Sequence, residues 1–337
     1  MKEINSIDKN KNCFNFIRLL VAIVILFCHY VMNMKLELSN QIFHAVKYIN
    51  AIPIFFALSG LLIWFSLDHC DSTKEYFKKR FLRIYPELWL VVILEIISIM
   101  IFYDKWDIKS LFLFTLTQGT FLQFWTPNSL RGYGCGTPNG SLWFICVLIQ
   151  FYIVIVILYK LLKNKKTYVW VITFISSVLI SIFGYEIVKL FNNEILLKLF
   201  NQTIFRHLWI FLIGCFVADK KETIIPFLKK FWFVFIIIAG IIYFFLKDIY
   251  LNYALLHTIF LVLGVFGFAY AFPNIKIKYD ISYELIIYHM IFVNIFIAIG
   301  YSNWVSTIYI TLITILLSVV TKYYINKFLI KKARLII

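Results

Sequence analysis

The sequence predicts an all-α polytopic membrane protein with about ten transmembrane helices and both termini in the cytoplasm. The chain of 337 residues is 62% hydrophobic and 20% aromatic, and its mean hydropathy is +0.86, far above that of an ordinary soluble domain. Hydrophobic segments follow one another from Phe14 to Ile325 with short polar gaps. Lys and Arg are concentrated in every second loop between these segments, and this bias predicts which side of the membrane each loop faces.

A helix needs about twenty apolar residues to cross the hydrocarbon core of a bilayer. On this criterion we expect one transmembrane domain over residues 1–337. The segment 109–125 contains Thr, Gln and Gly, which favours a re-entrant or interfacial element on the outer side over another span. The expected spans are 14–32, 48–67, 86–103, 141–162, 168–190, 204–219, 231–247, 252–272, 281–300 and 305–325.

The basic residues predict the orientation of these spans, because cytoplasmic loops carry an excess of Lys and Arg. With the N-terminus in the cytoplasm, the inner connections hold 24 of the 33 basic residues and the outer connections hold 9. If 109–125 crossed the membrane, the later loops would invert and this bias would largely disappear. The charge count therefore favours ten spans with both termini inside.

Composition also argues against several classes of protein. The net charge of +16 is scattered between apolar runs, whereas a nucleic-acid-binding protein gathers it on one face. The first apolar run is too long for a removable signal peptide and lacks a small-residue cleavage site. The six cysteines form no CxxC pair and no metal-like spacing, so we expect buried thiols and no metal site.

The first predicted span carries two ionisable residues. In "FIRLLVAIVILFCHY" (residues 16–30), Arg18 lies near one end and His29 near the other. At about 100° and 1.5 Å per residue, their separation places both on one helix face, about 16 Å apart. Either residue costs roughly 2.5 kcal/mol or more in the middle of a bilayer. A joint role on this shared face and two separate positions near the membrane interface are both open.

A basic cluster precedes the third span in "YFKKRFLRIYPELW" (residues 76–89). Arg80 and Arg83 stand three residues apart, so they point the same way on a helix. Two guanidinium groups on one face suit phosphate oxygens, although positive-inside anchoring also explains these charges. Pro86 is expected in the first turn of the next helix.

The segment "NGSLWFICVLIQFY" (residues 139–152) leads from an outer loop into the fourth span. Residues 139–141 are expected to form a turn and a cap, which includes Ser141. Trp143 lies at interface depth, where membrane anchoring and ligand contact are both open. Gln150 favours a hydrogen bond between helices. His289 lies near the middle of the ninth span, where a functional role and a buried hydrogen bond are both open.

Taken in order, these segments resemble the integral-membrane acyltransferase-3 family. The first span has the family's pattern of Arg, ten residues and His, and "RFLRIYPELW" resembles its RxxR-x-x-Pro element. The likeness covers nearly the whole chain. The other similar segments are "IPIFFALSGLLIWF", "GSLWFICVLIQFY", "RHLWIFLIGCFVA" and "ISYELIIYHMIFV".

This resemblance implies transfer of an acyl group, usually acetyl from acetyl-coenzyme A, to a hydroxyl of a saccharide or glycolipid of the cell envelope. It implies a multi-pass protein of the bacterial inner membrane, with acetyl-coenzyme A as donor and no permanently bound cofactor. Many relatives have Glu where this chain has Gln150, so an acidic role there is not expected. We expect the stand-alone form, without a secreted hydrolase-like domain.

Matching the motifs position by position makes His29 the catalytic histidine. A histidine is the usual residue for taking a hydroxyl proton near neutral pH, and the sequence leaves open whether His29 acts as a base or carries the acetyl group covalently. We assign binding of donor and substrate to Arg18, Arg80, Arg83, Ser141, Trp143 and His289.

Two other functions remain as alternatives. In a transporter or flippase for a saccharide or lipid-linked substrate, buried Arg and His residues line a path without chemistry. A purely structural membrane scaffold fits less well, because Arg18, His29 and His289 all lie inside spans. Nothing in the sequence indicates the acceptor or the oligomeric state.

Overall fold

The computed structural model describes residues 12–246, 253–275, 277 and 279–334. Within these residues the chain forms α-helices and one 3-10 turn, with no strand. This confirms the predicted all-α class. Nine helical stretches of the described chain are long and apolar enough to cross a membrane, and one shorter apolar helix of 17 residues adds a tenth.

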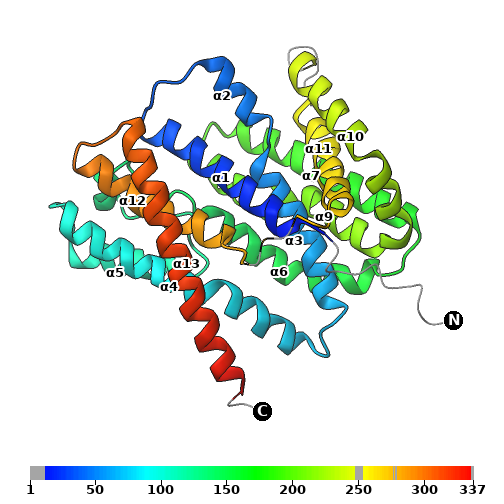
Figure 1. Ribbon diagram of the computed structural model, residues 1–337, viewed down its shortest axis with the longest axis horizontal. Helices are drawn as coiled ribbons and strands as arrows, with labels where there is room; N and C mark the ends of the chain where they lie inside the picture. Colours follow the sequence, from blue (N-terminus) through cyan, green and yellow to red (C-terminus); the bar gives the residue numbers. More distant parts are fainter. Residues whose placement is uncertain (1–11, 247–252, 276, 278, 335–337) are drawn as a thin grey trace. The chain divides into compact units, whose positions relative to one another are not determined.

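Each predicted span overlaps a long helix (Figure 1), although α4, α10 and α13 extend beyond the predicted bounds. Some short helices lie outside the predicted spans and precede or connect the long ones. The long helices are α1 (Phe14–Asn33), α3 (Ala51–Leu67), α4 (Thr73–Phe102), α6 (Trp143–Leu162), α7 (Thr167–Leu190), α9 (Ile204–Asp219), α10 (Lys221–Phe245), α11 (Tyr253–Ala271), α12 (Ser282–Ala298) and α13 (Trp304–Arg334). The short ones are α2 (Asn40–Lys47), α5 (Ile108–Gln118), α8 (Glu194–Asn201) and the 3-10 turn η1 (Asn128–Gly132).

Helix α4 begins well before the predicted span. The Ser72 hydroxyl accepts a hydrogen bond from the Glu75 backbone N–H at 3.2 Å, which caps the start of the helix. The residues that follow are mostly good helix formers. The prediction that Pro86 lies in the first turn is therefore wrong, since Pro86 lies inside a helix of 30 residues.

The segment 109–125 contains the short helix α5. Asp107 caps this helix by accepting a hydrogen bond from the Ser110 backbone N–H at 2.9 Å. At 11 residues the helix is about 16 Å long, roughly half the thickness of the hydrocarbon core. It is too short to cross a bilayer alone.

The chain folds into two compact units, each assembled from separate stretches of sequence. The first contains Met1–Val21, His44–Tyr76 and Gln150–Asp280, and the second contains Ala22–Phe43, Phe77–Ile149 and Ile281–Ile337. Helix α1 contributes residues to both. The single domain over 1–337 stays a prediction.

In the first unit, α10 packs along α11 (Figure 1) and α9 packs against α3 and α7. Small residues allow α3 and α9 to approach closely. A Cβ atom added to Gly60 would lie 2.1 Å from the Phe211 carbonyl oxygen, and one added to Gly214 would lie 1.9 Å from that of Ala57. Such contacts between backbones are typical of small residues at helix interfaces in membranes.

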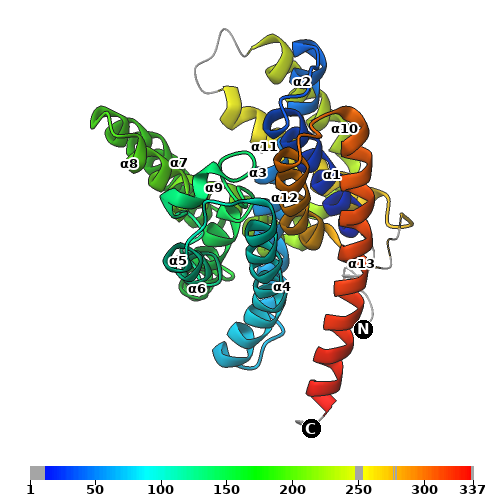
Figure 2. The same cartoon turned by 90° about the vertical axis from the view of Figure 1, so that its left-hand side faces the viewer.

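In the second unit, α12 packs along the long helix α13 (Figure 2). Helix α12 also contacts α4, because the Tyr283 hydroxyl donates to the Ile84 carbonyl oxygen at 3.2 Å. Nearly every residue from Ser282 to Asn294 is buried. Helix α12 is therefore the buried centre of this unit.

Two glycine substitutions should have opposite effects, because Gly214 lies at the contact between α3 and α9 whereas Gly240 lies in open space. Gly214→Ala should destabilise the protein by about 1–3 kcal/mol, because the new methyl group overlaps backbone atoms that cannot rotate away. Gly240→Ala on α10 is the matched control, since nothing lies within 4 Å of its added Cβ; it should stabilise the helix by about 0.5–1 kcal/mol. Thermal unfolding in detergent measures both. Equal melting temperatures for the two variants would contradict this account of the contact.

Candidate active site

Two histidines from distant parts of the sequence meet in the second unit. His29 of α1 and His289 of α12 approach with His29 Nδ1 2.8 Å from His289 Nε2. Their rings stack, with centroids 5.0 Å apart and planes inclined by 24°. His289 is completely buried, whereas His29 is part-buried. The structure thus brings together two of the predicted site residues.

The backbone of α12 fixes the positions of the protons in this pair. His289 Nδ1 lies 3.1 Å from the Leu285 carbonyl oxygen, which only accepts hydrogen bonds, so Nδ1 carries a proton. In the neutral ring Nε2 then has a lone pair, and His29 Nδ1 must donate to it. His29 therefore keeps its own lone pair on Nε2, and no described residue forms a hydrogen bond with that atom. A neutral Nε2 of this kind can accept a proton from a substrate hydroxyl.

Ser141 lies beside the histidine pair and is held there by Asn139. Ser141 Oγ is 3.3 Å from His29 Nδ1. Since Nδ1 carries a proton, Ser141 Oγ accepts a hydrogen bond from it, and the Nδ1–H donor is shared between Ser141 and His289. The Ser141 backbone N–H donates to Asn139 Oδ1 at 3.0 Å. Asn139 Nδ2 donates to the Ile287 carbonyl oxygen at 2.9 Å and also to the Glu95 carboxyl group. These three hydrogen bonds of the Asn139 side chain hold the segment that leads into α6.

Glu95 is a site residue that the sequence analysis missed. Its side chain is 1% exposed and lies inside α4. One carboxyl oxygen accepts from Asn139, and the other has no hydrogen-bond partner among the described residues. The signal was present in the sequence, because an acidic residue within an apolar run is costly in a membrane and marks function by default, the same principle that identified His29.

Asn294 of α12 holds the loop that leads to Asn139. Its Oδ1 accepts from the Cys135 backbone N–H at 2.8 Å, and its Nδ2 donates to the carbonyl oxygens of Thr137 and Pro138 at 3.0 and 2.6 Å. Gly134 has a φ of +56°, and a Cβ there would lie 2.1 Å from Asn294 Oδ1. Only glycine suits that position. The loop is thus fixed to α12, the helix that carries His289.

Two ionisable groups of the same loop stay neutral near physiological pH. Burial raises the pKa of the Tyr133 hydroxyl to about 12, and burial also raises the pKa of the Cys135 thiol. Desolvation disfavours the charged form of both groups. The loop beside Asn294 therefore gains no charge from these two side chains.

Comparison with known proteins identifies the family. A family model described as an acyltransferase domain, that of acyltransferase family 3, matches residues 11–325. The chain belongs to this family. This match confirms the resemblance found in the sequence.

The chain is also similar to a bacterial nodulation protein. Nodulation protein 10 of Rhizobium leguminosarum bv. viciae is 26% identical to this chain over 170 residues. The match covers 47% of this chain and 46% of that protein, so the chain spans about half the length of this relative. No solved structure matches the chain.

The predicted basic pair lies in the same unit as the histidines. Arg80 and Arg83 are both part-buried on α4, and the Arg83 guanidinium carbon lies 5.8 Å from the centroid of the Tyr283 ring. On α12, Tyr283 and His289 are separated by about 9 Å along the helix axis. Arg83, one of the two predicted phosphate-binding arginines, thus contacts the helix that carries His289.

A buried ion pair and a buried hydrogen bond fix α12 between Tyr283 and His289. The Tyr288 hydroxyl donates to the Glu87 carboxylate at 2.6 Å, which joins α12 to α4. Lys322 Nζ donates to the Glu284 carboxylate at 2.6 Å, which joins α12 to α13. Both carboxylates are at least nine-tenths buried. The helix is therefore held on two sides, at Glu284 and at Tyr288, just before His289.

The remaining predicted residues have separate environments. Arg18 forms an ion pair with Asp280 in the first unit. Trp143 is part-buried in the first turn of α6, two residues after Ser141. Gln150 Oε1 accepts a hydrogen bond from the Ile204 backbone N–H of α9 at 2.8 Å, which confirms the predicted hydrogen bond between helices. Among the described residues, no group of three or more His, Cys, Asp or Glu side chains is arranged to bind a metal ion.

Asn139→Ala tests the support of the site. It removes three hydrogen bonds and leaves the buried Glu95 carboxyl group without its partner, so we expect a loss of about 2–4 kcal/mol in stability and a lower turnover. Glu95→Leu added to this variant should restore part of the stability, because no buried carboxyl group is then left unpaired. Thermal unfolding of the single variants and the double variant measures the coupling. Asn128→Ala, at an exposed position of the same loop, is the control; a melting temperature for Asn139→Ala equal to that of this control would contradict the assignment.

Proposed function

We propose that this acyltransferase moves an acetyl group from acetyl-coenzyme A to a hydroxyl of a cell-envelope saccharide or glycolipid, in the inner membrane of a bacterium. The observation that supports the proposal best is the hydrogen-bonded chain from the Leu285 carbonyl oxygen through His289 to His29. This chain leaves His29 Nε2 as a base, and attack of a hydroxyl on a thioester needs a base to remove the hydroxyl proton.

In the proposed reaction His29 acts as base and then as acid. Nε2 takes the proton of the acceptor hydroxyl as the oxygen attacks the thioester carbonyl carbon. The carbon–sulfur bond then breaks, and the protonated Nε2 gives its proton to the departing thiolate. The products are the acetyl ester and coenzyme A. Ser141 Oγ accepts from His29, so its own hydroxyl proton remains for an oxygen of the substrate.

His289 is proposed to position His29 and to stabilise its charged form. While Nε2 of His29 holds the transferred proton, both ring nitrogens of His29 are donors. His289 Nε2 then accepts a hydrogen bond from a charged donor, which is about twice as strong as one from a neutral donor. Since its other nitrogen donates to the backbone of its own helix, His289 supplies this acceptor without moving.

Arg80 and Arg83 are proposed to bind the phosphates of acetyl-coenzyme A. They stand on one face of α4, and Arg83 lies against Tyr283, about 9 Å along α12 from His289. The pantetheine arm of coenzyme A is long and flexible, so phosphates held at this end leave the thioester free to reach deeper into the unit. The predicted orientation places this end on the cytoplasmic side, where acetyl-coenzyme A is made.

Release of coenzyme A from labelled acetyl-coenzyme A by the purified protein tests the proposed function. A transporter would release no coenzyme A, so the same assay distinguishes the two functions. His29→Ala should lower turnover by roughly 10²- to 10⁴-fold, the usual contribution of a general base, with membrane insertion intact. His289→Leu should lower kcat because His29 loses its acceptor, whereas His289→Gln should retain more activity since its amide oxygen accepts a hydrogen bond. His69→Ala, at an exposed position, is the control. Near-normal turnover in His29→Ala would overturn the proposal.

Arginine-to-lysine variants test the donor site. Lysine keeps the charge and the orientation signal of Arg80 and Arg83 but loses the planar fork. Each single Lys variant should raise the Michaelis constant for acetyl-coenzyme A about 10- to 150-fold, the equivalent of one charge-assisted hydrogen bond, and leave that of the acceptor nearly unchanged. Lys78→Arg, an exchange at an exposed neighbour, is the control. Wild-type donor kinetics in both Lys variants would mean that the pair only anchors the protein in the membrane.

A further inference from the structure

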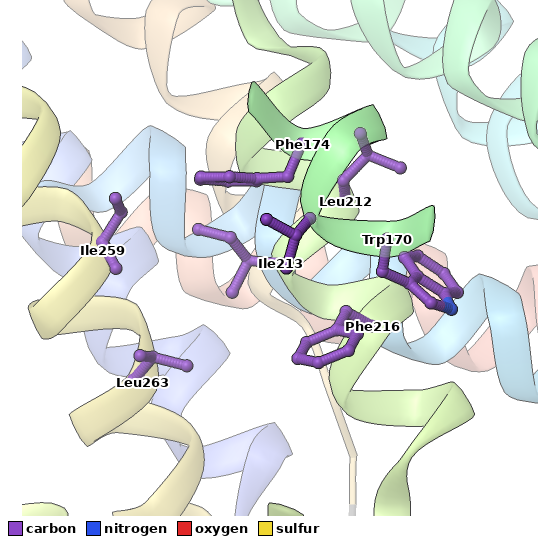
Figure 3. A pocket seen from close by; sticks show the side chains of 8 residues that line it. Trp170, Phe174, Leu212, Ile213, Phe216, Ile259 and Leu263 are labelled. Carbon is purple, nitrogen blue, oxygen red and sulfur yellow. The ribbon is translucent and has the colours of Figure 1, made fainter. Parts of the chain in front are cut away.

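The first unit contains an apolar groove that the acyl-transfer reaction does not use. It is lined by residues of three helices, shown in Figure 3: Trp170 and Phe174 belong to α7, Leu212 and Phe216 to α9, and Ile259 and Leu263 to α11. All the lining side chains are hydrophobic. The groove therefore offers no hydrogen bond to a ligand and selects hydrocarbon.

Aromatic contacts hold the groove open in a fixed shape. The Trp170 ring packs against Trp64 of α3, with centroids 5.2 Å apart, and against Phe216, with centroids 5.6 Å apart. Leu212 at the floor is 1% exposed, whereas Val171 at the rim is 47% exposed. The floor is thus packed and the rim is open, which suits a ligand that enters from the surrounding bilayer.

The size of the groove fits a length of hydrocarbon chain. Its volume is about 210 Å³, larger than the engineered apolar cavity of about 150 Å³ that binds benzene and stays free of water. A groove of this kind in a membrane-spanning helix bundle is in contact with lipid. The acyl chain of a lipid is therefore the occupant that the surroundings supply.

Positive charge lies close to one end of the groove. Lys165 and Lys166 are exposed and directly precede α7. Lys166 is one turn before Trp170, a rise of about 6 Å, and the N-terminus of α7 adds the positive end of the helix dipole. Lys220, at the end of α9, pairs with Asp219 at 3.0 Å. The two lysines before α7 are thus well placed for the phosphate of a lipid whose chain lies in the groove.

We propose that the groove binds one acyl chain of an anionic phospholipid and that Lys165 and Lys166 bind its phosphate. By the count of basic residues this end of α7 faces the cytoplasm, so the lipid belongs to the inner leaflet. The bound chain fills the space between α7 and α11 above α9. The site shares no residue with the proposed acyl-transfer site.

Native mass spectrometry of the full chain in detergent tests the proposal with phosphatidylglycerol and with phosphatidylcholine of the same acyl chains. A lysine at a membrane surface contributes about 1 kcal/mol to the binding of an anionic lipid, so two should favour phosphatidylglycerol about 25-fold. Lys165→Gln with Lys166→Gln should remove this preference and leave the affinity for phosphatidylcholine unchanged. Equal affinities of the wild type for the two lipids would overturn the proposal.

A second pair of variants tests the groove itself. Val171→Trp places a large ring over the rim and should abolish tight binding of phosphatidylglycerol. Ile172→Trp, the adjacent position on α7, is 60% exposed and does not line the groove, so it should bind as the wild type does. If Val171→Trp unfolds, Ile259→Trp blocks the groove from α11. Wild-type binding in a folded blocking variant would show that the chain lies elsewhere and would overturn the proposal.

Discussion

The contact between His29 and His289 is the constraint on which the second unit depends. A polar ring inside the hydrocarbon core must find a partner, because an unpaired one costs several kcal/mol. His289 is fully buried and satisfies one nitrogen with the carbonyl oxygen of its own helix. Within the described part of the chain, the hydrogen-bond partner of its other nitrogen is His29. Because the Leu285 carbonyl oxygen can only accept, His289 Nδ1 carries the proton and His289 Nε2 has the lone pair. His29 Nδ1 must therefore donate, and this sets the proton positions in both rings.

Two buried asparagines convert this contact into a shaped site. Asn139 links the start of α6 to α4 and α12, and Asn294 links the preceding loop to α12. Both amides use their donor and their acceptor sides. Ser141 therefore approaches His29 from a segment that is anchored on both sides. The histidines, the serine and the loop form one connected network around α12.

The sequence predicted the elements well because apolar length and charge bias depend only on local composition. It also singled out His29 and His289, since each interrupts an apolar run. It did not predict that they meet, because periodicity places a residue on a helix face without saying which helices pack together. Pro86 was misplaced because the cap formed by Ser72 and Glu75 was overlooked, and Glu95 was missed although the same cost that identifies His29 applies to it.

Because His29 Nδ1 donates its proton to His289, the lone pair of the neutral His29 ring lies on Nε2. Nitrogen-15 NMR of the protein labelled at histidine measures this directly, with the His29 signals assigned by their loss in His29→Ala. The account predicts neutral His29 with its proton on Nδ1, and a shift of the proton toward Nε2 when His289 is replaced by leucine. A His29 ring that carries its proton on Nε2 in the wild type, or one that His289→Leu leaves unchanged, would contradict it.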